Sequence, residues 1–377
     1  MSTQPLQQPH GDVVAKRPAR FRALDQVRGL AIFCMILAHF GPGVYERLGI
    51  GGTPRAMLDL IGRLATPAFV LIFGITLAII YVPKARKAPD ATMRGLINRS
   101  GLVLLCSLIV SLHGTVNVLM TSDEPAFWFR LLLAQYSVLT FYTVAIFLTA
   151  LAVRFIAQDP VRIGFLGGAL LIFIGSVLGY EAFPFQGEKA IELVRLLFVS
   201  GKYGVFVMMG CAWLMIGVGV LIRNHLANGT SFHRDVMAIA LGMALLGLSD
   251  GRVVGWRTLG DLASGYAAPP QFWYLAMVGG AMLSALVALD RYTVPVVGFV
   301  LERIGRYPLS IYVAHSFVLP GVALLRWAAP TLPEAIGTVG CLLLFIVFCV
   351  YKVWTSTAPD RARRALTSGP IDVRRVI

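Results

Sequence analysis

The first apolar segment of the chain carries three ionisable residues whose spacing favours chemistry. Asp25 and Arg28 are three residues apart, and His39 follows Arg28 by eleven. Eleven residues make just over three turns of an α-helix, so Arg28 and His39 project within about 20° of one another and lie about 16 Å apart along the axis. Asp25 lies one turn before Arg28 on nearly the same face. One face of this helix therefore carries an acid and a base near one end and an imidazole deeper in.

Such a face is costly against lipid, so we expect it to line protein or a water-filled cavity. An imidazole titrates near neutral pH and can accept the proton of a hydroxyl or amine nucleophile. Each residue also has a simpler explanation. Asp25 and Arg28 could form an interfacial ion pair with Arg28 snorkelling to water, and His39 could hydrogen-bond between helices. The alignment of all three favours a catalytic role over these separate explanations.

The composition identifies the elements that must position these residues. Of the 377 residues, 57% are apolar and only 14% are charged, whereas a soluble domain has about 25% charged residues. This excludes an ordinary soluble globule, a disordered chain and a coiled coil. The apolar residues form long continuous runs, not the short alternating segments of a membrane β-barrel. The sequence therefore predicts an all-α, polytopic membrane protein.

Ten apolar runs are near the length needed to cross a bilayer. They cover residues 24–44, 57–81, 96–119, 130–154, 161–181, 202–222, 235–250, 271–290, 308–328 and 334–354. Together they predict a membrane domain over 24–354, with a disordered basic tail at 1–23 and a second basic tail at 355–377. Residues 295–304 are too short to span and have an apolar stripe, which predicts an amphipathic helix at the membrane surface.

Most of the 33 Lys and Arg residues lie in the two tails and in alternate loops. The positive-inside rule then places both termini in the cytoplasm and the chain in the plasma (inner) membrane. The same rule explains the net charge of +14 without a nucleic-acid partner. The five cysteines lie inside apolar runs and form no CxxC pair, so we interpret them as buried hydrophobes. We predict neither a metal nor a tightly bound cofactor.

Three segments together resemble the integral-membrane acyltransferase superfamily, which includes acyltransferase family 3, OpgC-like proteins and heparan-α-glucosaminide N-acetyltransferase-like proteins. The first, residues 22–40 (RALDQVRGLAIFCMILAHF), resembles the family's opening span, in which an Arg precedes a His. The second, residues 63–76 (RLATPAFVLIFGIT), is similar to a "TP.F.F..G" helix. The third, residues 304–315 (IGRYPLSIYVAH), resembles a late "GR.SL..Y..H" segment. The resemblance follows the order of features across nearly the whole membrane region.

The resemblance implies transfer of an acyl group, acetyl or succinyl, from cytoplasmic acyl-CoA as co-substrate to a saccharide or other envelope acceptor. His39 is then the catalytic base or transient acyl carrier. Arg28 acts at the donor side, and Asp25 positions Arg28. A second group completes the donor site opposite Arg28, formed by Arg306, Tyr312 and His315. The alternative for Tyr312 and His315 is a structural pair that ties the ninth span to its neighbours.

Two further polar residues are candidate substrate contacts. Arg63, at the start of the second span, could hold an anionic acceptor or stabilise an oxyanion, or it could anchor the helix at the interface. His113, late in the third span, could contact substrate or hydrogen-bond to a neighbouring helix. The oligomeric state is left open by the sequence.

Two other functions fit parts of the pattern. A transporter or flippase for an envelope precursor would use the same polar face, although such proteins commonly show repeats with interrupted helices, and we find none in the sequence. A non-catalytic membrane assembly partner would not need the aligned Asp25, Arg28 and His39. We therefore favour the acyltransferase.

Overall fold

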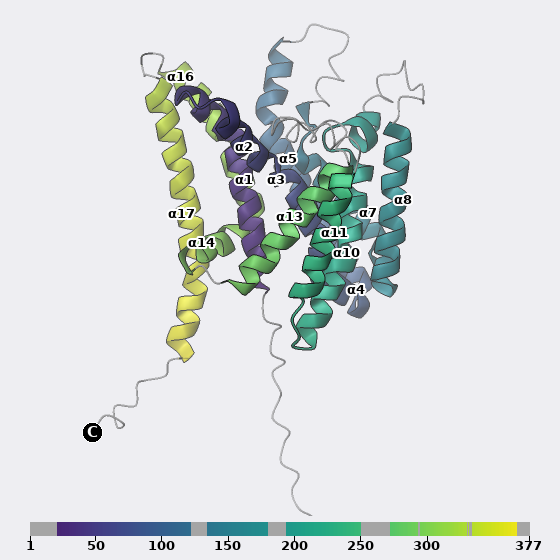
Figure 1. The fold of residues 1–377 in the computed structure, drawn as a ribbon. Coiled ribbons are helices and arrows are strands. Elements are labelled where there is room, and N and C mark those ends of the chain that lie inside the picture. The colour runs from purple at the N-terminus through teal and green to yellow at the C-terminus, as the bar shows by residue number, and fades with distance from the viewer. Residues whose placement is uncertain are drawn as a thin grey trace, which may run out of the picture.

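The structure is a computed structural model that describes residues 21–121, 134–179, 194–249, 272–292, 295–329, 331 and 334–367. Within these residues every regular element is a helix, which confirms the all-α class. Figure 1 shows long helices aligned in a bundle, with α17 (Glu334–Thr367) at one edge and α8 (Pro160–Gly179) at the other. We call the end of the bundle that holds the start of the first helix the inner end, and the opposite end the outer end. Long apolar helices packed in this way form a multi-pass membrane protein.

Eight helical segments in the described chain are long and apolar enough to cross a bilayer. Each of them overlaps a predicted span, although α5 begins seven residues before the predicted 96 and the fourth, discussed below, begins later than predicted. They are formed by α1 (Arg22–Arg47); by α2 (Gly52–Arg63), α3 (Ala65–Thr76), the π-helix η1 (Leu77–Tyr81) and α4 (Val82–Lys87) in one continuous segment; and by α5 (Pro89–Thr121), α7 (Val138–Gln158), α8, α10 (Val205–Ala227), α13 (Phe272–Arg291) and α17.

The other two predicted spans are not among these eight segments of the described chain. The predicted span 235–250 is α11 (His233–Ser249), which has 17 residues and packs along α13. The predicted span 308–328 is divided into α15 (Pro308–Ser316) and α16 (Val318–Ala328). The break has a physical cause, because Pro320 has no N–H to donate to the Ser316 carbonyl.

Three predicted boundaries also shift. Helix α7 begins eight residues later than the predicted 130, because Ser137 and Thr140 form a capping box at its start. Helix α17 continues to Thr367, so much of the predicted tail 355–377 is helical. Helix α1 begins at Arg22, inside the predicted tail 1–23, and residues 1–20 and 368–377 lie outside the described residues.

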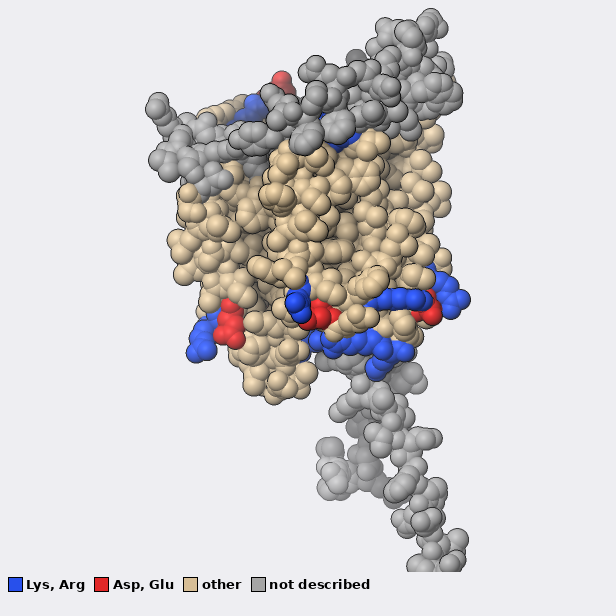
Figure 2. Space-filling model, turned by 90° about the vertical axis from the view of Figure 1, so that its right-hand side faces the viewer, with Lys and Arg blue, Asp and Glu red and all other residues tan. Residues whose placement is uncertain are grey.

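The surface of the bundle is apolar between two charged rims. Figure 2 shows this on one face, where Lys, Arg, Asp and Glu gather near the ends and leave a broad band without charge. Large apolar side chains are exposed along this band, among them Leu105, Phe173 and Leu344 on α5, α8 and α17. Exposed apolar side chains at this density are those expected of a surface in contact with lipid.

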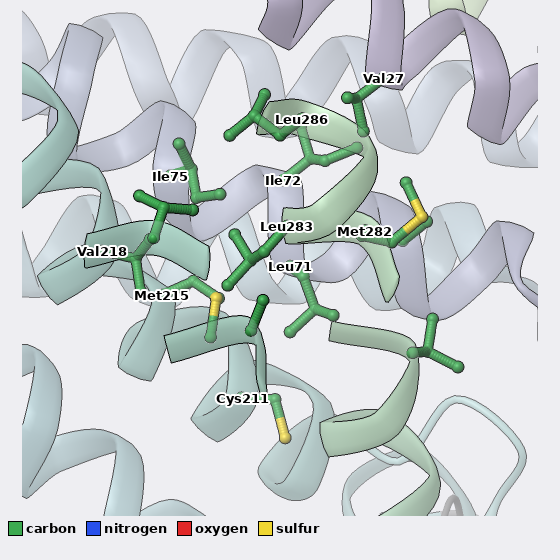
Figure 3. Close-up of a cluster of buried hydrophobic side chains, with 14 of the residues drawn as sticks. Val27, Leu71, Ile72, Ile75, Cys211, Met215, Val218, Met282, Leu283 and Leu286 are labelled. Carbon is green, nitrogen blue, oxygen red and sulfur yellow. The ribbon is translucent and has the colours of Figure 1, made fainter. Parts of the chain in front are cut away.

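The core that holds α1 in place lies between α1, α3, α10 and α13. Figure 3 shows its side chains meeting from these four helices, including Val27, Ile72, Met215 and Leu286. The second helical segment and α10 are therefore the scaffold against which the ionisable face of α1 is oriented.

The predicted surface helix is α14 (Pro295–Gly305), and it packs on the inner end of α1. Its apolar side chains are turned outward, with Val296 75% exposed, whereas Glu302 and Arg303 are buried. This arrangement suits a helix at the inner membrane surface, because its apolar face meets lipid and its charged face meets the ionisable end of α1.

Candidate active site

The Asp25–Arg28 pair is buried inside the protein at the inner end. Arg28 Nη1 donates to Asp25 Oδ1 at 2.9 Å, and Arg28 Nη2 donates to Thr76 Oγ1. The Asp25 side chain is 3% exposed and that of Arg28 18%. The guanidinium therefore bridges α1 and α3 instead of snorkelling to water, and the i,i+3 ion pair of Asp25 and Arg28 is present.

Thr76 holds Arg28 at an irregular point of the second helical segment. It is the last residue of α3, and the π-helix η1 follows immediately. Thr76 Oγ1 donates to the Ile72 carbonyl at 2.7 Å, which fixes the hydroxyl so that its lone pairs can accept from Arg28. Single π-helical turns are frequent at functional sites because they re-aim the side chains around them.

Two glycines let α14 approach the same end of α1. A Cβ on Gly29 would lie 2.1 Å from the Leu301 carbonyl oxygen, and one on Gly305 would lie 1.8 Å from the Asp25 carbonyl oxygen. Gln26 Nε2 also donates to the Gly298 carbonyl at 3.2 Å. These backbone contacts fix the position of α14 along the axis of α1, and therefore also the position at which α15 begins.

Arg306 follows α14 directly and forms an i,i+4 ion pair with Glu302. Both side chains are largely buried, at 17% and 10% exposed. Arg306 is thus at the inner end, as predicted, and its guanidinium is engaged by a carboxylate of its own segment.

His315 lies against His39, and Tyr312 packs on His315, while the donor-site role predicted for these two residues stays a prediction. The rings of His39 and His315 have centroids 4.9 Å apart, and the Tyr312 ring meets that of His315 edge-on at 4.9 Å. The Gly305 contact places the end of α14 beside Asp25 at the inner end. Helix α15 begins three residues later and has nine residues, and His315, next to its last residue, meets His39.

A tyrosine from α7 lies between the two ends. Tyr142 is within electrostatic range of both Arg28 and Tyr312, and its buried hydroxyl has no hydrogen-bond partner in the part of the chain that the structure describes. Buried phenols ordinarily find a partner. Tyr142 therefore connects the Arg28 end and the His39 end and has hydrogen-bonding capacity for a ligand.

Two cations approach His39 from the outer side. Lys202 lies in the turn between the π-helix η2 (Leu196–Ser200) and α10, within electrostatic range of His39 and Arg63. Burial, together with the Arg63 charge, lowers the pKa of Lys202 below its usual range. Arg63 ends α2, next to Gly62, which packs on Ala38 of α1.

Lys202 is not among the site residues predicted from the sequence, because a Lys at the start of a predicted span is ordinarily interpreted as a charge at the membrane interface. The signal that would have found it is the Gly-Lys-Tyr-Gly turn at 201–204. Tyr136 Oη accepts a hydrogen bond from the Tyr203 N–H at 2.6 Å, which fixes this turn. His113 is part of α5, but its side chain lies outside the described part of the chain.

Other cations lie at the inner end beside the Arg28 cluster. Lys84 Nζ is 5.8 Å from the centroid of the Tyr81 ring, and the Arg99 guanidinium carbon is 5.7 Å from it. Tyr81 is also within electrostatic range of Arg28. An aromatic ring between two exposed cations can stack a planar group and bind phosphates beside it.

Comparison with known proteins identifies the family. A family model described as heparan-alpha-glucosaminide N-acetyltransferase, catalytic, matches residues 20–247, more than half of the chain. The chain belongs to this family. It is a membrane acyltransferase of the N-acetyltransferase type, as the sequence resemblance predicts. A comparison with curated proteins gave no match.

The family match covers the first part of the site and not the second. Asp25, Arg28, His39, Arg63 and Lys202 lie within residues 20–247, whereas α15 lies beyond them. The place of His315 beside His39 is therefore a finding of the structure.

Proposed function

We propose that the protein transfers an acyl group, acetyl or succinyl, from acyl-CoA on the cytoplasmic side of the plasma (inner) membrane to a saccharide or other envelope acceptor. The observation that carries this proposal is the position of His39, an exposed imidazole in a membrane helix with the Arg28 cluster on one side and Lys202 on the other. A base with polar side chains on both its inner and its outer side suits a reaction between two substrates that arrive from opposite ends of the bundle.

In this proposal the donor enters at the inner end. Lys84 and Arg99 bind its phosphates, and Tyr81 lies against its base. Arg28 attracts the diphosphate, and the thioester arm extends past Tyr142 and Tyr312 towards His39. The separation of Arg28 and His39, about 16 Å of helix rise, requires a long and flexible arm. The orphaned Tyr142 hydroxyl supplies a hydrogen bond to an amide of that arm.

The acceptor enters from the outer end, where Arg63 and Lys202 favour an anionic or strongly polar group. Its amine or hydroxyl attacks the thioester carbonyl carbon while His39 takes the proton of the nucleophile. The C–S bond then breaks, and coenzyme A leaves as a thiol after receiving that proton. Atoms balance, because the acceptor gains the acyl group and the thiolate gains the hydrogen that the acceptor loses.

Purified protein incubated with radiolabelled acetyl-CoA or succinyl-CoA and a panel of amino sugars and envelope glycans tests this function. We expect label transfer by the wild type and none by His39→Ala. His225→Ala is the matched control, because His225, in the last turn of α10, hydrogen-bonds to Thr230 and to Asp235 of α11, away from the site. Transfer that is equal in wild type and His39→Ala contradicts the proposal.

The proposed sidedness has its own test in intact cells. Single cysteines replacing Lys87, the last residue of α4, and Gly49, in the loop after α1, are exposed to a membrane-impermeant maleimide. The background is a chain in which the five native cysteines are replaced by serine or alanine. We expect labelling of Gly49→Cys from outside the cell and of Lys87→Cys only after the membrane is opened. The reverse pattern contradicts cytoplasmic termini.

A further inference from the structure

His315 is held in one tautomer by a backbone group. Its Nδ1 is hydrogen-bonded to the Tyr312 carbonyl oxygen, one turn earlier in α15. A carbonyl oxygen only accepts, so the hydrogen of this bond belongs to Nδ1. In the neutral ring the lone pair is therefore on Nε2, the other nitrogen.

The Tyr312 carbonyl lies near the C-terminal end of a short helix, because α15 ends at Ser316. Ser316 Oγ donates to the same oxygen at 2.9 Å. Two side-chain donors thus share this carbonyl, and they fix the orientation of the His315 ring.

The environment of His315 leaves it little freedom and no bulk water. The residue is 4% exposed, with the Tyr312 ring on one side and the Phe40 ring centroid 6.2 Å away on another. The His39 ring, 4.9 Å away and tilted by 53°, is its remaining polar neighbour among these rings. The lone pair on His315 Nε2 can accept a hydrogen bond, and His39 is an adjacent side chain whose ring N–H can donate one.

We propose that His315 is a positioning residue for His39. In the complex with substrates, His315 Nε2 accepts a hydrogen bond from one ring nitrogen of His39, and the other nitrogen of His39 faces the acceptor as the proton acceptor. This places His315 in the role that an orienting carboxylate plays in hydrolase triads. A neutral imidazole suits this position because a buried carboxylate would be costly in an apolar helix bundle. The inference rests on the proposed acyl transfer at His39.

The proton count of the cycle is unchanged by His315. The nucleophile gives its proton to the free nitrogen of His39, and the imidazolium that forms has a hydrogen on each nitrogen, one of them donated to His315. When the C–S bond breaks, the leaving thiolate takes the proton back from the nitrogen that received it. His315 neither gains nor loses a hydrogen, and its lone pair stabilises the imidazolium throughout.

The decisive variants differ in whether they keep an acceptor. His315→Leu removes the lone pair, and we expect kcat to fall about 10- to 100-fold with little change in the KM for acyl-CoA. His315→Gln keeps an oxygen acceptor and is expected to recover part of the loss. In His315→Gly, added imidazole is expected to restore turnover. His225→Gln is the matched control for loss of a histidine.

A readout that is independent of turnover is the reaction of His39 with diethyl pyrocarbonate, followed by mass spectrometry. An imidazole whose N–H is hydrogen-bonded to an acceptor is the better nucleophile, so we expect slower modification of His39 in His315→Leu than in wild type or His225→Gln. Circular dichroism and thermal unfolding show whether each variant is folded.

The outcomes separate this inference from the proposed function. An unchanged His39 modification rate in folded His315→Leu overturns the positioning role, whatever the activity. A raised KM for acyl-CoA at unchanged kcat also overturns it, because it shows a donor contact. Absence of transfer by the wild type with every thioester overturns the proposed function, and a slower modification rate in His315→Leu then still supports the contact with His39.

Discussion

The inner and outer parts of the site are built in different ways. At the inner end, Asp25, Arg28 and Thr76 form a hydrogen-bonded chain between α1 and α3, and two glycines hold α14 in backbone contact. Near the outer end, His39 meets His315 through ring contact and is exposed. A buried ion pair is strongly coupled to its surroundings, and removal of one partner is costly. From this difference we propose that the inner end fixes the geometry and that the chemistry takes place at the His39 end.

The largest expected effect is the loss of turnover in His39→Ala. General-base catalysis contributes about 10²- to 10⁴-fold, so kcat should fall by that factor while thermal stability changes little, because the side chain is exposed. Steady-state kinetics and thermal unfolding in the same detergent measure both quantities. If His39→Ala instead lowered the unfolding temperature strongly while the protein that stays folded kept a normal kcat, the roles proposed for the two ends would be reversed.

Arg28→Lys is expected to damage the inner end next most strongly. A lysine cannot donate to Asp25 and Thr76 at once in the planar geometry of a guanidinium. Loss of one charge-assisted hydrogen bond is worth about tenfold or more, and we expect this factor in the KM for acyl-CoA. Donor titrations at saturating acceptor measure it, and Arg234→Lys, whose side chain is 97% exposed, is the control. Equal KM values in wild type and Arg28→Lys would remove Arg28 from the donor site.

Gly305→Ala tests whether the inner end sets the height of α15. The added Cβ would lie 1.8 Å from the Asp25 carbonyl, so the helices must separate. Overpacking of this kind costs about 1–3 kcal/mol, and we expect a lower unfolding temperature together with a lower kcat as His315 moves from His39. Gly95→Ala on α5, where a Cβ would meet nothing within 4 Å, is the matched control. A stable, fully active Gly305→Ala variant would show that the crossing does not position the histidines.

The smallest expected effect is a pH dependence at Lys202. Its pKa is lowered by burial and by Arg63, so its positive charge is lost at a lower pH than that of an ordinary lysine. If Lys202 attracts an anionic acceptor, the acceptor KM should rise as pH increases through this lowered pKa, by up to about fivefold. In Lys202→Arg the charge persists and the rise should disappear. A rise of equal size in both proteins would assign it to another group.

The sequence predicts the helices better than it predicts how they meet. Periodicity and charge identify the span of α1, the surface helix at 295–304 and the aligned face of Arg28 and His39, since these are properties of single segments. The contact of His315 with His39 depends on the position of α15 along the bundle axis. That position is set by the close backbone contact of Gly305 with Asp25, and the hydrophobic periodicity of a single segment does not predict such a contact. Lys202 was missed for the same reason, because only tertiary packing of the turn before α10 brings it to His39.

We propose that donor binding belongs to the inner end and acyl transfer to His39. Equilibrium binding of radiolabelled acyl-CoA, measured beside single-turnover transfer in His39→Ala and Arg28→Lys, distinguishes these two roles. His39→Ala should bind the donor with wild-type affinity and transfer at least about 100-fold more slowly. Arg28→Lys should bind the donor about tenfold more weakly and transfer, once saturated, at a rate near that of the wild type. Loss of donor binding in His39→Ala, or wild-type donor binding in Arg28→Lys, would contradict the division between the two ends.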